Sequence, residues 1–362
     1  MSPVFGASTA NADSNVMYME VLHKEAQKLG LAALFHEKPF AGINGSGKHS
    51  NWSVQTDTGM NFFHPGKNDA AHKLFVTGIA ALSYGLNQYN ELMRCAAACA
   101  GNDHRLGAQE APPAIISLYP GIGFEEHIDS IIAGGPLLGY EAKKTTAAPG
   151  AGPAMAAPRG SEDRNRTAPF PHCSNRFEFR AVGSSQNCSF PVAVCNTIMA
   201  KGMAKLSELI ESGVSHRDAV AQLLKENRRV IFTGNGYSEE WLEEAAKRGL
   251  PNLKTTPEAT REFNSEKNRK LFEEMGIYSA EECEARQEVM YESYVTQLNV
   301  EVETLIDMVE TGILPACAKD LEKYEHSKDL AGDRKAIYRS IKQETERLRQ
   351  MMEKRPEELA ED

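Results

Sequence analysis

The sequence predicts an α+β fold, with strands in its first part and helices in its second. A five-residue segment at 176–180 alternates charged and aromatic side chains with the period of a β-strand, whereas apolar residues within 16–29 recur at helical spacing. Beyond residue 190, segment after segment carries the start and stop signals of helices. We therefore expect a strand-containing part at residues 1–190 and a helical part at residues 191–362.

The composition narrows the class of protein. Of 362 residues, 41% are hydrophobic, which is enough for two compact units with ordinary cores. A net charge of −10 argues against a nucleic-acid partner, because phosphate binding needs a basic surface. No run of about 18 apolar residues is present, so we expect no membrane partner. Seven cysteines without C-x-x-C spacing indicate reduced thiols and a cytoplasmic location, with organellar targeting of a longer native chain left open.

The first predicted elements lead into a glycine-rich loop. Asp13 or Ser14 can cap a helix that ends at Gly30. Apolar residues 31–35 then predict a short buried strand, which delivers the chain to the loop.

Two further segments are distinguished by small residues. Residues 69–100 predict a long helix that stops at Gly101. Cys95 and Cys99 lie one turn apart on it and are interpreted as core packing rather than as a metal pair, because no second pair accompanies them. Residues 145–160 consist mainly of Ala, Pro and Gly, and they predict a flexible loop because they bury too little apolar surface to offset their ordering entropy.

The helical part is expected to contain seven segments. They are residues 190–213, 215–229, 238–249, 257–276, 279–312, 315–326 and 331–354. The fifth opens with a capping box from Ser279 to Glu282. The last places mixed charges on one face and four apolar residues on the other, which favours packing in a bundle. Those four are Ile337, Ile341, Leu348 and Met351.

The glycine-rich loop at residues 38–53 reads KPFAGINGSGKHSNWS and is close to two phosphate-handling motifs. Gly42, Gly47 and Lys48 have the spacing of the P-loop G-x-x-x-x-G-K-[ST], with His49 in place of the hydroxyl residue. A P-loop must open a helix whose N-terminus faces the phosphates, yet the residues that follow are β-branched and turn-rich. We therefore favour the alternative, in which His49 is a metal ligand after a loop whose main chain approaches a small substrate.

The alternating strand carries a second motif. Arg176, Glu178 and Arg180 project from one face of this strand, and Phe177 and Phe179 from the other. One interpretation is a half-buried surface strand with its charges in water. The other is a site that holds magnesium together with anions, because arginine presents a fixed fork of donors to carboxylates and phosphates.

A third motif lies between these two. Residues 102–113 are polar, contain a glycine and a proline pair, and predict a loop. Taken alone, the segment is an ordinary turn with an exposed ion pair.

The three motifs in this order resemble the glutamine synthetase family, and its long type III branch in particular. By that resemblance Asn44 and Gly45 bind glutamate, His49 binds a metal ion and Ser53 binds ATP. The second histidine common in the family's loop is Asn51 here, which is similar to the type III pattern.

On the strand, the resemblance implies that Glu178 is a metal ligand and that Arg180 holds glutamate. Arg176 and Arg166 would bind nucleotide phosphates, and Arg166 would also be catalytic.

In the polar block, the resemblance implies that Arg105 grips the substrate carboxylate. Glu110 would belong to a mobile flap that covers the acyl-phosphate, and as a catalytic residue it would take a proton from ammonium. The spacing from Arg105 to Glu110 is one residue shorter than in the bacterial type I pattern, which again resembles type III.

The resemblance implies an incomplete antiparallel-sheet catalytic domain of glutamine synthetase, followed by its helical remainder and a helical C-terminal extension. The implied activity is ATP-dependent ligation of ammonia to L-glutamate through a glutamyl acyl-phosphate, which gives glutamine. Mg²⁺ or Mn²⁺ is the implied cofactor and ATP a substrate, and the full-length form is expected to be a homo-oligomer.

The family's remaining glutamate ligands are expected upstream of Met1 and are not in this sequence. We therefore expect a fragment with weak or no activity alone. Two alternatives stay open: a non-catalytic module for nucleotide binding or subunit association, and a related ligase that joins glutamate to another amine. Because Arg105 and Arg180 both match the family's grip on glutamate, a changed acid substrate is disfavoured.

Overall fold

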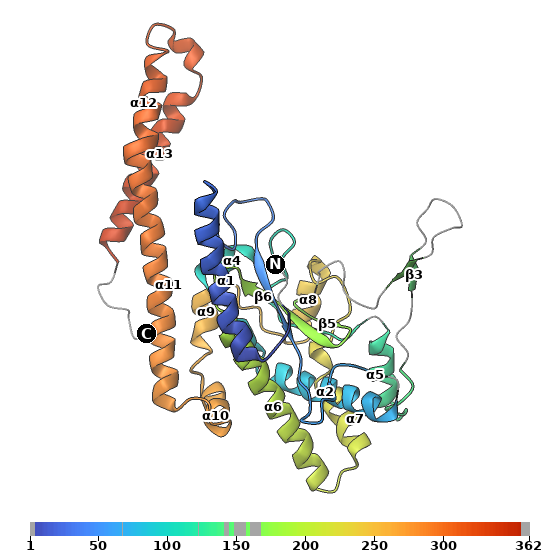
Figure 1. Cartoon of the computed structure of the whole chain (residues 1–362). Helices are drawn as coiled ribbons and strands as arrows, with labels where there is room; N and C mark the ends of the chain where they lie inside the picture. Colours follow the sequence, from blue (N-terminus) through green and yellow to red (C-terminus); the bar gives the residue numbers. More distant parts are fainter. Residues whose placement is uncertain are drawn as a thin grey trace. The chain divides into compact units, whose positions relative to one another are not determined.

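The computed structural model describes residues 4–66, 68–121, 123–140, 145–147, 157–159 and 168–355. It has the expected mixed α+β fold (Figure 1). The chain forms two compact units, residues 1–287 and residues 288–362. The sequence predicted a boundary at residue 190 between two parts of a family domain, which is a different kind of boundary from one between compact units. That boundary stays a prediction.

One sheet of four strands positions the motifs, in the order β1-β6-β5-β2. The strands are β1 (Gly47–Trp52), β2 (Leu118–Tyr119), β5 (Phe170–Cys173) and β6 (Arg176–Gly183). β6 pairs antiparallel with both β1 and β5, as the antiparallel expectation requires, whereas the short β2 pairs with β5 in parallel.

β6 confirms the predicted alternation. Phe177 and Phe179 are fully buried, and the sequence neighbour Glu178 is half-buried on the opposite face. On β1, Asn51 pairs with Glu178, and the register shifts between Lys48 and Ser50. The shift is a bulge in which two β6 residues, Arg180 and Ala181, face His49 alone, and a bulge re-aims the side chains beside it. A strand here, instead of a helix, removes the structural basis of a P-loop.

Helices of the first unit pack together beside this sheet. Figure 1 shows α2 (Asp69–Gln88), α6 (Ser189–Glu211) and α7 (His216–Glu226) side by side. Trp52 of β1 donates its indole N–H to Asn196 of α6, at 2.8 Å. The other helices are α1 (Ser8–Lys28), α3 (Asn90–Cys95), α4 (Ala100–Arg105), α5 (Phe124–Ile132), the 3-10 turn η1 (Arg228–Val230), α8 (Glu239–Lys247), α9 (Thr256–Arg261) and α10 (Glu266–Glu274).

The N-terminal expectations were partly wrong. α1 begins at Ser8, several residues before the predicted caps Asp13 and Ser14. Residues 31–35 form no strand, and Leu31 and Leu34 are 64% and 70% exposed. The helix end explains this difference, because Gly30 adopts a φ of 69° and the Leu31 amide donates to the carbonyl of Ala26, as part of the cap.

Other predicted segments are divided differently. The helix expected at 69–100 breaks at Tyr89 (φ −127°, ψ 37°), and Gly101 lies inside α4 instead of stopping a helix. The first residues of the loop expected at 102–113 belong to the same α4, because tertiary hydrogen bonds described below hold them. The helix expected at 257–276 is two helices, α9 and α10.

Within the predicted flexible loop at residues 145–160, the strands β3 (Thr145–Ala147) and β4 (Ala157–Arg159) form an antiparallel pair. The loop expectation is therefore wrong for these strands. Residues 148–156 and 160 lie outside the described residues.

The second unit contains most of α11 (Ala280–Met308), a π-helical turn η2 (Val309–Ile313), α12 (Leu314–Glu322), η3 (Lys328–Ala331) and α13 (Arg334–Glu353). The predicted capping box is confirmed: the Glu282 amide donates to Ser279 Oγ at 3.2 Å, and the Ser279 amide donates to the Glu282 carboxylate at 2.8 Å.

The apolar face predicted for α13 is only partly right. Ile341 and Leu348 are half-buried, but Ile337 and Met351 are 54% and 62% exposed. Thr345 is buried instead.

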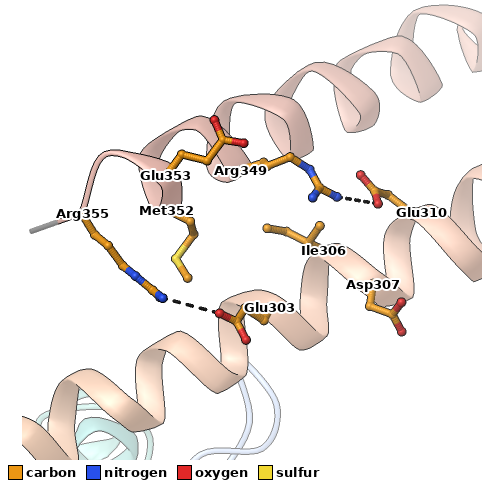
Figure 2. A pocket seen from close by; sticks show the side chains of 8 residues that line it. All are labelled: Glu303, Ile306, Asp307, Glu310, Arg349, Met352, Glu353 and Arg355. Atoms are coloured by element: carbon orange, nitrogen blue, oxygen red, sulfur yellow. Dashed lines mark hydrogen bonds and ion pairs between the residues drawn. The ribbon is translucent and has the colours of Figure 1, made fainter. Parts of the chain in front are cut away.

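A groove of about 510 Å³ lies between α11 and α13 (Figure 2). Arg349 pairs with Glu310 at 2.6 Å, and Arg355 pairs with Glu303 at 3.6 Å across it. Its lining residues are Glu303, Ile306, Asp307, Glu310, Arg349, Met352, Glu353 and Arg355.

Among the described residues, no helix is long and apolar enough to span a membrane. All seven cysteines are free, as expected. Cys95 is buried and Cys99 half-buried, which fits their interpretation as packing residues.

Candidate active site

His49, Glu178 and Arg180 meet on the polar face of the β1–β6 pair. His49 Nδ1 lies 2.8 Å from Glu178 Oε1. Arg180 donates to the other carboxylate oxygen through Nε and a terminal nitrogen, each at 2.9 Å. The structure thus brings together one residue of the glycine-rich loop and two of the alternating strand.

Glu178 is held in its charged form. Burial raises the pKa of its carboxyl group, but the hydrogen bond from His49 and the charge and hydrogen bond of Arg180 outweigh burial and lower this pKa to about 2. The Glu178 carboxylate is therefore ionised at neutral pH and can bind a cation.

His49 and Glu178 fit a shared metal ion. Imidazole nitrogen and carboxylate oxygen are both ligands of divalent cations, and adjacent ligands of an octahedral ion with bonds of about 2.1 Å lie roughly 3 Å apart. The 2.8 Å between the two side chains is close to that spacing. Within the part of the chain that the structure describes, no group of three or more His, Cys, Asp or Glu side chains has the geometry of a metal site.

The glycine-rich loop lies against Arg105. A Cβ atom at Gly47 would lie 2.2 Å from a terminal nitrogen of Arg105, and one at Gly45 would lie 2.3 Å from the carbonyl oxygen of Glu37. Neither position has room for a side chain. Asn44, beside Gly45, is exposed.

Arg105 itself is occupied by the main chain of β6. Arg105 is 4% exposed, and its guanidinium donates to the carbonyl oxygens of Arg180 at 3.1 Å, Val182 at 3.3 Å and Ala181 at 3.4 Å. Burial lowers its pKa, and the nearby Glu37 charge opposes that effect. Arg105 therefore anchors β6 through three carbonyl groups and lies beside Gly47 of the glycine-rich loop. Its expected role in binding the substrate carboxylate stays a prediction.

Ser53 and Arg176, both expected to contact nucleotide, meet at the turn before β6. Ser53 Oγ donates to the carbonyl of Asn175 at 3.0 Å, and Arg176 donates to the Asn175 side chain at 3.3 Å. Arg176 Nε also donates to Asn51 Oδ1 at 2.7 Å. The asparagine that replaces the family's second histidine thus orients a predicted nucleotide-binding arginine.

Glu110 is exposed and has a φ of 51°, unusual for a residue with a side chain. Its segment is closed by the Gly107 amide, which donates to the carbonyl of Pro112 at 2.8 Å. Lys38 donates to Gln109 Oε1 at 2.7 Å and so links the glycine-rich loop to this segment. Arg166 lies outside the described residues.

Sequence reasoning missed Glu37. It is 1% exposed, and its Oε1 accepts hydrogen bonds from the amide and the hydroxyl of Ser185, at 2.8 and 2.5 Å. A Cβ atom at Gly101 or Gly183 would lie 2.4 Å from its carboxylate. The sequence signal that could have indicated Glu37 was its charge two residues after the apolar segment 31–35.

Two family models match the chain. A model described as "Glutamine synthetase, catalytic domain" matches residues 4–115, and one described as "Glutamine synthetase C-terminal domain" matches residues 217–328. The type-3 glutamine synthetase of Dictyostelium discoideum is 43% identical over 338 residues, covering 91% of this chain and 45% of that protein.

A glutamine synthetase of Bacteroides fragilis (strain YCH46) is 36% identical over 365 residues, covering 94% of this chain and 50% of that protein. The chain thus spans about half the length of these curated relatives. Its two matched regions and its likeness to these relatives show that the chain belongs to the glutamine synthetase family.

Proposed function

We propose that this chain carries part of a catalytic site for the ATP-dependent ligation of ammonia to L-glutamate, which gives glutamine through a glutamyl acyl-phosphate. The observation that carries the proposal is the His49–Glu178–Arg180 cluster, in which a histidine and an arginine flank one ionised carboxylate. Membership of this family places the proposed activity in glutamine biosynthesis and nitrogen metabolism.

The residues of this cluster would bind two different ligands, a metal ion and glutamate. His49 and Glu178 would hold Mg²⁺ or Mn²⁺, which when bound supplies positive charge to the transferring phosphoryl group. Arg180 would orient the glutamate carboxylate with the Asn44–Gly45 main chain. Its fixed fork suits a carboxylate, and Glu178 already holds it in place at 2.9 Å.

The remaining predicted residues would contact ATP and the acyl-phosphate. Ser53, Arg176 and Arg166 would contact ATP, with Arg166 also stabilising charge during transfer. Glu110 would cover the intermediate and remove a proton from ammonium. Arg105 would keep β6 in register with the loop and reach glutamate only after local rearrangement.

We further propose that the chain alone has weak or no activity and acts in a cytoplasmic homo-oligomer of full-length subunits. Free cysteines support the location. The finding that only two candidate metal ligands meet in the described residues supports the low activity.

The same finding favours a second candidate, a non-catalytic module that binds nucleotide or associates with full-length subunits. Such a module needs the fold and the nucleotide contacts but no complete set of metal ligands.

Binding of Mn²⁺ alone tests the proposed site without requiring turnover. Calorimetry is expected to show Mn²⁺ binding to the chain, and Glu178→Ala and His49→Ala are each expected to weaken it by about tenfold or more. Glu243→Ala, which removes an exposed carboxylate of α8, is the matched control and should bind as the unaltered chain does. Equal affinity in all four proteins would contradict the assignment of His49 and Glu178.

Glutamine formation separates the two candidate functions. Purified chain is mixed with glutamate, ammonia, ATP and Mg²⁺, and glutamine is measured directly. Slow formation that Glu178→Ala abolishes supports the ligase, whereas nucleotide binding without glutamine formation supports the non-catalytic module.

A further inference from the structure

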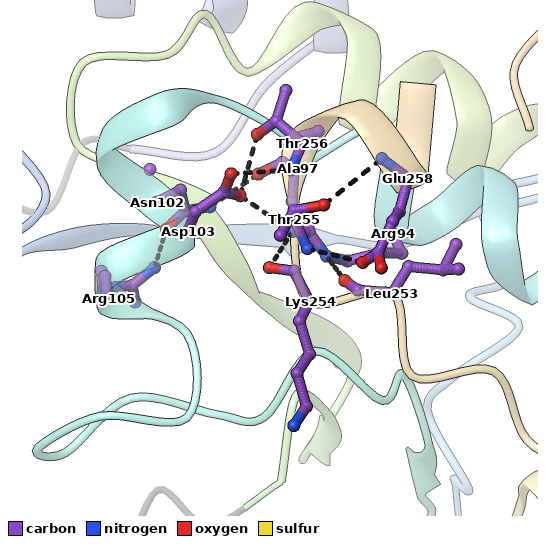
Figure 3. Close-up of polar contacts among 12 residues, drawn as sticks. Arg94, Ala97, Asn102, Asp103, Arg105, Leu253, Lys254, Thr255, Thr256 and Glu258 are labelled. Atoms are coloured by element: carbon purple, nitrogen blue, oxygen red, sulfur yellow. Dashed lines mark hydrogen bonds and ion pairs between the residues drawn. The ribbon is translucent and has the colours of Figure 1, made fainter. Parts of the chain in front are cut away.

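Arg94, on α3, is a buried cation that joins three segments. Its side chain is 1% exposed. Nε donates to the carbonyl of Leu253 at 2.8 Å, and a terminal nitrogen donates to Lys254 O at 3.3 Å and to Asp103 Oδ1 at 3.1 Å (Figure 3). Burial lowers the pKa of Arg94, and the Asp103 carboxylate opposes that effect. A buried charge is stable only with such a partner.

Asp103, the partner, also holds the start of α9. The amide of Thr256 donates to its Oδ2 at 2.7 Å, and the Thr256 hydroxyl donates to its Oδ1 at 2.8 Å. Thr256 is the first residue of α9 and is 4% exposed. One carboxylate therefore binds α3, α4 and α9 together, as Figure 3 shows.

The neighbours of Asp103 in α4 hold β6. Asn102 Nδ2 donates to the carbonyls of Ala97 at 2.6 Å and Ala181 at 2.7 Å. Its Oδ1 accepts from Arg105 at 3.1 Å, and Arg105 donates to the carbonyl of Arg180 at 3.1 Å. α4 has six residues, too few to be stable by its own hydrogen bonds, so these side-chain bonds fix its position.

We propose that Asp103 is a positioning residue for the candidate active site. It fixes α4 against the start of α9, and α4 in turn fixes β6 through Asn102 and Arg105, which sets where Glu178 lies relative to His49. The two regions matched by the family models, residues 4–115 and 217–328, meet through this carboxylate. The effect of Asp103 on catalysis rests on the proposed function, but the hydrogen-bonded linkage from Asp103 to β6 does not.

Hydrogen exchange of the full chain tests the linkage directly. Asp103→Asn keeps the size of the side chain, removes its charge and leaves the buried Arg94 without its anionic partner. The amides of β6 are expected to exchange about tenfold faster or more, while those of α7, which do not depend on α4, keep their rates. Glu243→Gln is the matched control for loss of a carboxylate and should leave both sets unchanged.

Thr256→Val provides a milder variant in case Asp103→Asn does not fold. It removes one hydrogen bond to Asp103 and keeps the bond from the backbone amide. A few-fold rise in β6 exchange is expected. Combined with Asp103→Asn, it should add less than its own separate effect, because both changes break one network.

Two outcomes would overturn the proposal. One is unaltered β6 exchange in both variants, and the other is a rise of equal size in β6 and α7, which indicates general destabilisation. Mn²⁺ binding separates this result from the proposed function: the linkage predicts about tenfold weaker binding in Asp103→Asn. If the unaltered chain binds no Mn²⁺, the function fails while the exchange data still decide the linkage.

Discussion

The Arg94–Asp103 pair in the first unit and the Arg349–Glu310 pair in the second have similar chemistry and opposite surroundings. The first is 1% and 13% exposed and also bonds to main-chain groups of Leu253, Lys254 and Thr256. The second spans the groove with side chains 47% and 43% exposed. The buried pair therefore contributes to the geometry of its surroundings, whereas the exposed pair of the second unit competes with hydration and contributes little.

The largest expected difference between the regions comes from removing each arginine. Arg94→Met should destabilise the protein by about 3–5 kcal/mol, because it leaves Asp103 buried without its cation. Arg349→Met should cost less than about 1 kcal/mol, because its partner stays hydrated. Urea unfolding followed by circular dichroism measures both. Similar losses for the two variants would show that burial does not separate these pairs.

A smaller effect is expected from adding one methyl group to a glycine in each region. Gly47→Ala should cost about 1–3 kcal/mol and disturb the loop, because its Cβ would collide with the pinned Arg105 guanidinium. A Cβ at Gly312 meets no described atom within 4 Å, so Gly312→Ala should be neutral or stabilise by up to about 1 kcal/mol. Thermal unfolding of both variants measures the difference, and a stable Gly47→Ala protein would show that Arg105 moves easily.

The smallest effect concerns cysteine chemistry. Burial raises the pKa of both Cys95 and Cys99 to about 12, so these thiols stay protonated at pH 8 and should react slowly with iodoacetamide. Half-exposed Cys317 of the second unit should be alkylated first. Mass spectrometry of the alkylated peptides gives the order. Adding urea is the control, because all sites should then react at similar rates.

Local patterns predicted what depends on neighbours in sequence. The faces of β6 and the capping box at Ser279 were right, because a period of two and a four-residue cap are decided locally. The approach of His49 to Glu178, 129 positions apart, came from the family resemblance, since no spacing rule relates them.

Tertiary bonds account for what was missed. α4 was taken for loop because its helical residues are held by Asn102 and Arg105 bonds to a distant strand. The buried carboxylate of Glu37 was not anticipated either, since its partner Ser185 is far along the chain. The functional roles expected for all the site residues stay predictions: Asn44, Gly45, His49, Ser53, Arg105, Glu110, Arg166, Arg176, Glu178 and Arg180.

The bulge opposite His49 makes β6 intolerant of changes in length. Removing one of the two β6 residues opposite His49, Arg180 or Ala181, would restore even pairing with β1 and turn the side chains on one side of the deletion to the other face of the sheet. Natural variants and grafted versions of this strand should therefore tolerate substitutions at exposed positions but not single-residue insertions or deletions. In a variant library selected for folding, in-frame insertions and deletions within this strand should be lost more often than substitutions at the same positions.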